Sequence, residues 1–128
     1  DHLALFCPAN DPLAAKETVE WADFNNRPFI ALTPENPLQR RIDQLLEANG
    51  VMARRQFSVR FSATLLALVN EGLGIGILPA GSEGLSPMVN IVMRPITDQI
   101  ASRSVVALTL RERTLSPAAR SFFLHLTG

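Results

Sequence analysis

The stretch NEGLGIGILPAG, residues 70–81, places glycines at every second position among aliphatic side chains. A dinucleotide- or phosphate-binding loop needs its glycines after a strand and ahead of a helix, so that the helix amides point at the phosphate. Here the order is reversed, because Gly72 follows a helical segment and Gly74 and Gly76 lie in the next strand. We therefore interpret Gly72 as a helix stop, and the two strand glycines as sites of close helix–sheet packing.

The composition is that of a soluble globular domain of ordinary size. Of the 128 residues, 47% are hydrophobic and 19% are charged, which is enough for a single core. Lysine plus arginine and aspartate plus glutamate number 12 each, so no overall field steers the chain to nucleic acid. Arg54, Arg55 and Arg60 form a local basic cluster, which we interpret as a solvated face.

Cysteine usage and hydropathy indicate a cytoplasmic protein. The single cysteine, Cys7, excludes an internal disulfide and fits a reducing compartment. No apolar run approaches the roughly 20 residues that span a bilayer, so no membrane partner is expected. The strand-like run LALFCP at residues 3–8 begins almost at the first residue, and this abrupt start predicts a fragment of a longer protein.

Strand-like and helical segments alternate at short spacings, which predicts an α/β fold with a mostly parallel sheet flanked by helices. Strands are predicted where apolar runs end at turn residues, at 3–8, 27–32, 54–61, 73–79, 91–96 and 104–110. Helices are predicted where apolar residues recur at helical spacing, at 19–24, 37–49, 63–71 and from Pro117 onward, with Ser116 as the last N-cap.

Start and stop signals bound the two central helices. Asn36 is expected to cap the first of them, with Pro37 at its first position and Gln39 closing a capping box. Gly50 then ends this helix in the left-handed conformation. Ser62 is expected to cap the second helix.

The second central helix, residues 63–71, is apolar almost all round. Its aliphatic residues do not keep to one face, as those of a surface helix do. Such a helix must be buried on more than one side, either in the core or against a partner chain. The residues concerned are Leu65, Leu66, Leu68 and Val69.

Polar residues gather where two predicted strands end and helices begin. Ligands of open α/β sheets bind outside the carboxyl ends of strands, where backbone N–H groups converge. These residues either cap the helices or bind a ligand. Binding is the favoured interpretation for Thr33, because Asn36 is available as the cap, and for Ser62 both interpretations stay open. The candidate binding residues are Thr33, Pro34, Glu35, Asn36, Ser62 and Thr64.

The sequence offers no constellation of catalytic or metal-ligating residues. His2 and His125 lie near opposite ends of the chain, and neither has a metal ligand at a suitable spacing. The segment GSEG around Ser82 lacks the hydrolase elbow pattern. Glu35 and Asp43 are two helical turns apart and are interpreted as solvated. We therefore expect no catalytic residue, no metal site and no cofactor.

The order of these pieces resembles the effector-binding domain of LysR-type transcriptional regulators over essentially the whole chain. The most specific part is ALVNEGLGIGILP at 67–79, supported by NDPLA at 10–14 and SPAARSFF at 116–123. Each segment alone is a weak signal, and their co-linear order carries the resemblance. One departure is Asp11, where the family often has a histidine before the Pro-Leu-Ala turn. The turn is expected to form regardless.

The resemblance implies a fold like that of type 2 periplasmic solute-binding proteins, in which an effector cleft separates two α/β subdomains. It implies that about residues 8–103 form the second subdomain and about residues 104–128 return toward the first. DNA would then be bound only through an amino-terminal helix-turn-helix that this chain lacks. A homodimer or higher homo-oligomer is also implied, with helix 63–71 packed against the partner's first subdomain.

The resemblance further implies that the loop at residues 33–37 faces the effector cleft, and we expect the effector to be a small anion. The leading hypothesis is therefore a small-molecule-sensing regulatory domain. A fragment of a transport-linked solute-binding protein shares the fold and is the alternative. A small enzyme is disfavoured, because no acid–base or nucleophile constellation converges.

Overall fold

The computed structural model describes residues 2–85 and 89–97. The chain divides into two compact units, Asp1–Ile96 and Thr97–Gly128, and the described helices and strands belong to the first. The predicted strand at 104–110 and the helix from Pro117 lie outside the described residues. The elements are β1 (Leu3–Pro8), η1 (Pro12–Ala15), η2 (Trp21–Phe24), β2 (Pro28–Leu32), α1 (Pro37–Ala48), β3 (Arg54–Val59), α2 (Ser62–Asn70), β4 (Gly76–Pro79), η3 (Ala80–Leu85) and β5 (Ile91–Pro95), where η marks a 3-10 helix.

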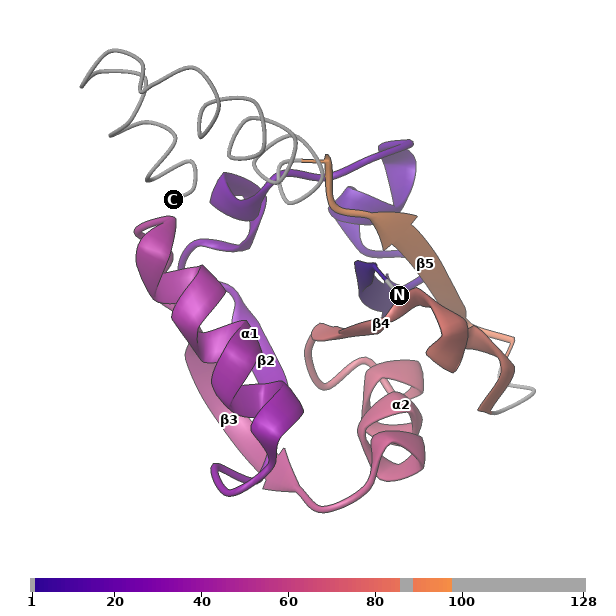
Figure 1. Cartoon of the computed structure of the whole chain (residues 1–128). Helices are drawn as coiled ribbons and strands as arrows, with labels where there is room; N and C mark the ends of the chain where they lie inside the picture. Colours follow the sequence, from indigo (N-terminus) through magenta and orange to yellow (C-terminus); the bar gives the residue numbers. More distant parts are fainter. Residues whose placement is uncertain (1, 86–88, 98–128) are drawn as a thin grey trace, which may run out of the picture. The chain divides into compact units, whose positions relative to one another are not determined.

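The described strands form a three-stranded sheet in the order β4-β1-β5 and a two-stranded sheet of β2 and β3, and a single bridge places β2 next to the start of β4 (Figure 1). β2 and β3 pair in parallel, and β1 pairs antiparallel with both β4 and β5. A parallel bridge joins Phe29 of β2 to Ile75, the residue before β4, with the Ile30 amide donating to the Ile75 carbonyl over 2.9 Å. β2, β3, β4 and β5 therefore run one way, and β1 runs the other way.

The expected α/β class is confirmed, with one correction to the mostly parallel sheet. Most described strands share a direction, but both pairings of β1 are antiparallel because β1 lies between two strands that run opposite to it. Strand direction is not encoded in the apolar pattern of a six-residue run, which is why the sequence did not predict this reversal. Within the described residues, no helix is long and apolar enough to cross a membrane.

The two faces of the sheet bury separate apolar clusters. Along β1, Leu5 and Cys7 join the cluster that holds Ile42 of α1, whereas Ala4 and Phe6 join the cluster that holds α2. This alternation is what a strand covered on both faces requires, since successive side chains point to opposite sides. α1 and α2 therefore cover opposite faces of the sheet.

Gly72, Gly74 and Gly76 have the roles that their order in the sequence predicts. Gly72 follows α2 with a φ of +84°, the left-handed conformation of a helix stop. A Cβ on Gly76 would lie 2.5 Å from Cδ2 of Leu65 in α2, and one on Gly74 would lie 3.0 Å from the Pro28 carbonyl oxygen. The strand glycines thus serve close packing.

The core accounts for most of the apolar surface of α2. Leu65, Leu66 and Val69 are buried against the sheet, and only Leu68 of the four aliphatic residues is half-buried. Of the two explanations for the all-round apolarity, the core explains these three residues. Their assignment to a dimer interface is corrected accordingly, because a partner cannot reach side chains that the same chain already covers.

Two of the predicted capping interactions are confirmed at α1 and two others are wrong. The Asn36 side chain accepts from the Leu38 amide over 2.8 Å, and Gly50 has a φ of +70°. The Gln39 side chain does not close a capping box, because it bonds to the Leu32 amide instead. Ser62 is not an N-cap either, since it is the first residue of α2 itself.

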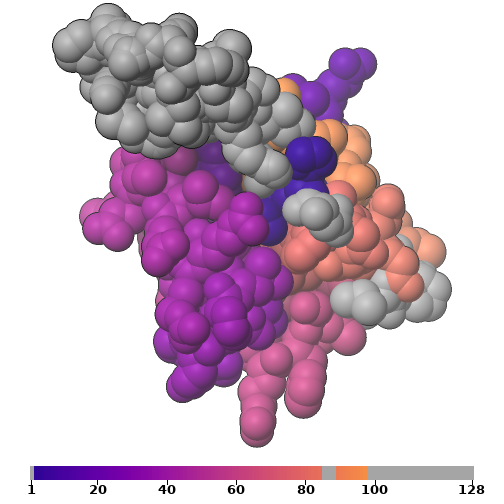
Figure 2. All heavy atoms as spheres, in the orientation of Figure 1, coloured from indigo at the N-terminus to yellow at the C-terminus, as the bar shows by residue number. Residues whose placement is uncertain are grey.

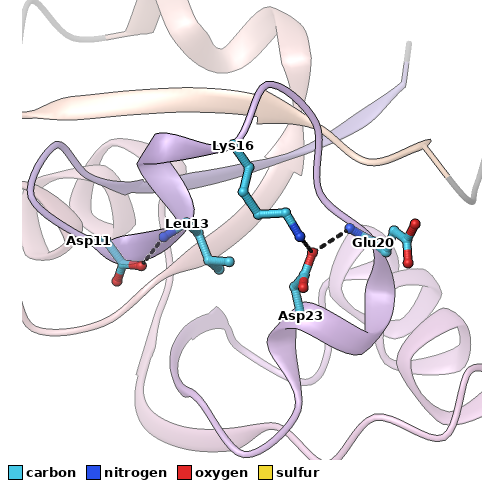
Figure 3. Close-up of polar contacts among 5 residues, drawn as sticks. All are labelled: Asp11, Leu13, Lys16, Glu20 and Asp23. Carbon is cyan, nitrogen blue, oxygen red and sulfur yellow. Dashed lines mark hydrogen bonds and ion pairs between the residues drawn. The ribbon is translucent and has the colours of Figure 1, made fainter.

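The segment between β1 and β2 is held by side-chain caps (Figure 3). Asp11 accepts from the Leu13 amide over 2.9 Å and forms an ion pair with Arg27, so the turn forms as expected with aspartate in place of histidine. In η2, Asp23 accepts from the Glu20 amide over 2.9 Å and from Lys16 Nζ over 2.7 Å. These carboxylates satisfy amides that a short helix leaves without partners.

Candidate functional site

A groove with a volume of about 590 Å³ lies at the carboxyl ends of β2 and β3. The segment that leads from β2 into α1 forms one side of it, and the segment that leads from β3 into α2 forms the other. Both segments lie at the lower end of the view, where atoms of the two helix starts are exposed (Figure 2). The groove is lined by Thr33, Glu35, Asn36, Arg60 and Phe61.

On the α1 side of the groove, the backbone is held by its own hydrogen bonds. The Thr33 amide donates to the Val59 carbonyl over 3.0 Å, which continues the β2–β3 ladder by one residue. The Thr33 carbonyl accepts from the Asn36 amide over 3.0 Å, and this bond closes the turn into α1. The Asn36 side chain is occupied as the helix cap. Within the described residues, the Thr33 hydroxyl has no hydrogen-bond partner.

On the α2 side, the helix start is open. Phe61 occupies the N-cap position in an extended conformation, and its carbonyl accepts from the Thr64 and Leu65 amides over 3.1 Å. A phenyl ring has no acceptor, so no side chain caps this helix. In the part of the chain that the structure describes, the amides of Ser62 and Ala63 donate to no protein acceptor. They carry the partial positive charge of a helix amino end.

The charges around the groove are of both signs. Arg60 is exposed and forms no ion pair among residues 2–85 and 89–97, so its guanidinium is free to meet a ligand. Glu35 supplies the one carboxylate of the lining, and its backbone carbonyl accepts from Arg40 Nη1 over 2.8 Å. The open amides and Arg60 together make the α2 side the positive side of the groove.

The structure brings together some of the predicted binding residues and leaves others at its margin. Thr33, Glu35 and Asn36 line the groove. Pro34 is exposed between them, and on α2 the half-buried Ser62 and the exposed Thr64 follow the lining residues directly. The hydroxyls on α2 have no hydrogen-bond partner among the described residues, so they are available at the groove's edge. These residue positions remain predictions as binding residues.

Sequence reasoning missed the two groove residues that immediately precede α2. The sequence predicts Arg60 in a solvated basic cluster and Phe61 within the strand at 54–61. β3 ends at Val59 instead, and Phe61 is 66% exposed. The available signal was position: a cation directly after one strand and before a helix start lies at the same sheet edge as Thr33.

The remaining reactive side chains do not form a second site in the described residues. Burial raises the pKa of the Cys7 thiol to about 11, and the Asp11 carboxylate adds to this rise, so the thiol stays protonated at neutral pH. His2 is exposed, whereas His125 lies outside the described residues. Among residues 2–85 and 89–97, no group of histidine, cysteine and carboxylate side chains is placed to hold a metal ion.

Comparison with known proteins gives one family. The family model described as LysR substrate binding domain matches residues 1–128. The HTH-type transcriptional regulator YbhD of Escherichia coli (strain K12) is 30% identical over 122 residues, which cover 95% of this chain and 38% of the relative. The chain thus spans about two fifths of the length of this relative.

Solved structures share the fold. The effector-binding domain of QuiR in complex with shikimate has a TM-score of 0.68 and 22% identity, over 75% of this chain and 45% of that one. The BenM effector-binding domain with its effector benzoate has a TM-score of 0.66 and 22% identity, over 76% of this chain and 45% of that one.

Proposed function

Because this chain belongs to the LysR substrate-binding domain family, we propose that it is the effector-sensing regulatory domain of a LysR-type transcriptional regulator. The relatives that it matches are transcriptional regulators of the HTH type, which favours a regulator over a solute-binding protein of a transport system. A sensing rather than a catalytic role follows from this proposal, and it needs no cofactor.

The groove is proposed as this chain's part of the effector site, and a small anion as its ligand. The single observation that carries this proposal is the open start of α2 beside Arg60. Two amides at the start of α2 have no acceptor among the described residues, and the amino end of a helix favours a nearby anion by about 0.3–1 kcal/mol. A hydrogen bond from a charged group such as Arg60 adds about 1.5–3 kcal/mol.

A carboxylate fits this arrangement better than a phosphate does. The lining includes the Glu35 carboxylate, which would repel a dianion more strongly than a monoanion. The exposed Phe61 ring offers an apolar surface beside the amides, suited to the carbon skeleton of an organic acid. Shikimate and benzoate, the ligands bound by the QuiR and BenM domains, are both small organic acids, which supports this choice.

The organisation of the whole regulator is also a proposal. We infer that about residues 8–103 form the second regulatory subdomain and that about residues 104–128 return to the first. DNA binding would belong to a helix-turn-helix outside this chain, in a cytoplasmic protein that forms a homodimer or higher homo-oligomer. With three of the four α2 aliphatic residues in the core, the half-buried Leu68 is the one that we retain at the association surface.

A titration with benzoate as the probe tests the anion site. We expect benzoate to shift the NMR amide signals of Thr33, Ser62 and Ala63, and we expect benzamide, its neutral analogue, to shift them less. Arg60→Gln should weaken benzoate binding by about 10-fold, since about 1.4 kcal/mol of charged hydrogen bonding corresponds to that factor. Arg41→Gln, which removes an exposed charge from α1, is the matched control.

Equal shifts with benzoate and benzamide, or shifts confined to residues away from the groove, would contradict the proposal. The regulatory role is tested separately in the full-length protein. There Thr33→Val, which keeps the side-chain shape and removes the hydroxyl, should reduce the transcriptional response to the inducer. An unchanged response would leave Thr33 a plain loop residue and make Ser62 and Thr64 the better candidates.

A further inference from the structure

Gln39 is a buried polar side chain. It forms a hydrogen bond to the backbone of Leu32, the residue that precedes Thr33 in the groove. It is 4% exposed, and it is the one buried polar residue of the described core. Its Oε1 accepts from the Leu32 amide over 3.0 Å, and its Nε2 donates to Asp43 Oδ1 over 2.9 Å. Both ends of the side-chain amide are therefore satisfied, as a buried amide requires.

The position of the Leu32 amide explains why a side chain is needed there. β2 and β4 meet at a single bridge, in which the Ile30 amide donates to the Ile75 carbonyl. In a parallel ladder the next amide of β2 to face β4 is that of Leu32, two residues on. At this point the side-chain oxygen of Gln39 in α1 accepts from the Leu32 amide, in place of a carbonyl of β4. Without it, a buried backbone N–H would have no acceptor, which a fold strongly avoids.

Thr33 follows Leu32 directly, so the conformation of the groove depends on this bond. The two consecutive amides are held from opposite sides, Leu32 by Gln39 and Thr33 by the Val59 carbonyl. We propose that Gln39 is a positioning residue of the groove, which fixes the carboxyl end of β2 so that the Thr33 hydroxyl faces the ligand. This inference rests on the proposed function for its consequence, but the positioning itself can be measured without a ligand.

Hydrogen bonds also connect Gln39 to β3 through Asp43. Asp43 Oδ1, which accepts from Gln39, also accepts from Arg55 Nη2 of β3 over 2.7 Å. This connection fixes which way the side-chain amide of Gln39 points, because only its NH2 end can donate to a carboxylate. The end of β2, α1 and β3 are thus tied together by one chain of hydrogen bonds.

Amide hydrogen exchange in the ligand-free chain tests the positioning. Gln39→Met keeps the size of the side chain and removes both hydrogen bonds. We expect exchange at Leu32 and Thr33 to quicken by about 10-fold or more, as local opening becomes easier, while Leu5 and Leu78 in the core, whose strands pair on the far side of β4 from β2, keep their protection. Gln44→Met, an exposed position on the same helix, should change none of these amides.

A second variant keeps the test decisive if Gln39→Met does not fold. Asp43→Ala leaves the bond between Gln39 and Leu32 possible but releases the other end of the side chain, so exchange at Leu32 and Thr33 should quicken by a smaller factor. Uniform loss of protection across the core in the folded variants would show a general structural role and overturn the inference. Unchanged exchange at Leu32 and Thr33 would overturn it as well.

Benzoate titration of Gln39→Met distinguishes this inference from the proposed function. Weaker benzoate binding by Gln39→Met, with binding by the control Gln44→Met unchanged, is the result that we expect from a misplaced Thr33. If the unsubstituted chain shows no benzoate-induced shifts in the groove, the proposed anion site fails. The exchange result still decides whether Gln39 positions Thr33.

Discussion

The two helices that meet at the groove begin in opposite ways. α1 starts with Asn36 as a side-chain cap and Pro37 at its first position, so most of its first amides are satisfied or absent. α2 starts after Phe61 with no side-chain cap, and its first amides have no acceptor among the described residues. The same sheet edge therefore carries one closed and one open helix start, and the open one is where a ligand can contribute an acceptor.

The two 3-10 helices between β1 and β2 also begin with side-chain caps. η1 is capped by Asp11, and η2 has a capping box between Glu20 and Asp23. α2 differs from these and from α1, although it is the most apolar helix of the described residues. We infer that α2 dispenses with a cap because its core face holds it in place, which leaves its start available for binding.

Removing the core packing of α2 should lower the free energy of unfolding more than any other change proposed here. Leu65→Ala removes a side chain that is 0% exposed and contacts the position of Gly76. We expect the free energy of unfolding to fall by about 2–5 kcal/mol, the usual cost of such a cavity. Urea denaturation at neutral pH measures this loss.

The control for this prediction is Leu68→Ala on the outer side of the same helix. Leu68 is half-buried, so its truncation should cost less than that of Leu65. If both substitutions cost the same, burial against the sheet is not what distinguishes the two sides of α2. The idea that packing replaces the cap would then fail.

A medium effect is expected from exchanging the two kinds of helix start. Phe61→Asn supplies α2 with a cap that can accept from its open amides, and should stabilise the fold by about 0.5–1 kcal/mol. The same change should weaken benzoate binding for two reasons, because the cap competes for the amides and because the Phe61 ring is lost from the groove; Phe61→Ala, which removes the ring without adding a cap, should therefore weaken binding less. Asn36→Ala, the matched change at α1, should destabilise by about 1 kcal/mol.

Opposite signs of the two stability changes would show that α1 relies on a side-chain cap and that α2 lacks one. Chemical denaturation measures the stabilities, and the benzoate titration measures the binding. A variant Phe61→Asn that is neither more stable nor poorer in binding would show that the amides of Ser62 and Ala63 are already satisfied, by water or by residues beyond those described.

The helix starts also show how far the sequence alone could lead. Asn36, Pro37 and Gly50 act through local geometry, so their roles were predictable from their spacing. The reversed order of glycines in residues 70–81 likewise predicted packing rather than phosphate binding, and Gly76 against Leu65 bears this out.

Roles that depend on distant segments were not predictable in this way. Gln39 has the spacing of a capping box, but a buried amide two residues past the β2–β4 bridge offers it a better partner. Ser62 has the residue type of a cap, yet β3 ends early and moves Phe61 into that position. For Gln39 a tertiary contact overrides the local signal, because the local signal is worth only about 1 kcal/mol. For Ser62 the structure differs only in where β3 ends and α2 begins.

The smallest expected effect concerns the capped start of η2, far from the groove along the chain. Burial works to raise the pKa of the Asp23 carboxyl, but hydrogen bonds from Lys16 and the Glu20 amide outweigh it and hold the pKa below its ordinary value of 3.8. Asp23 therefore stabilises the fold above about pH 4, and this contribution is lost as the pH falls through the lowered pKa. Since Lys16 is 45% exposed, the contribution should be about 0.5 kcal/mol.

Between pH 5 and pH 2.5, Asp23→Asn should therefore lose less stability than the unsubstituted chain, and the difference should be about 0.5 kcal/mol. Urea titrations at both pH values measure it. Glu17→Gln controls for the change in net charge, and an equal loss in the Asp23→Asn variant would mean that this cap acts without its charge.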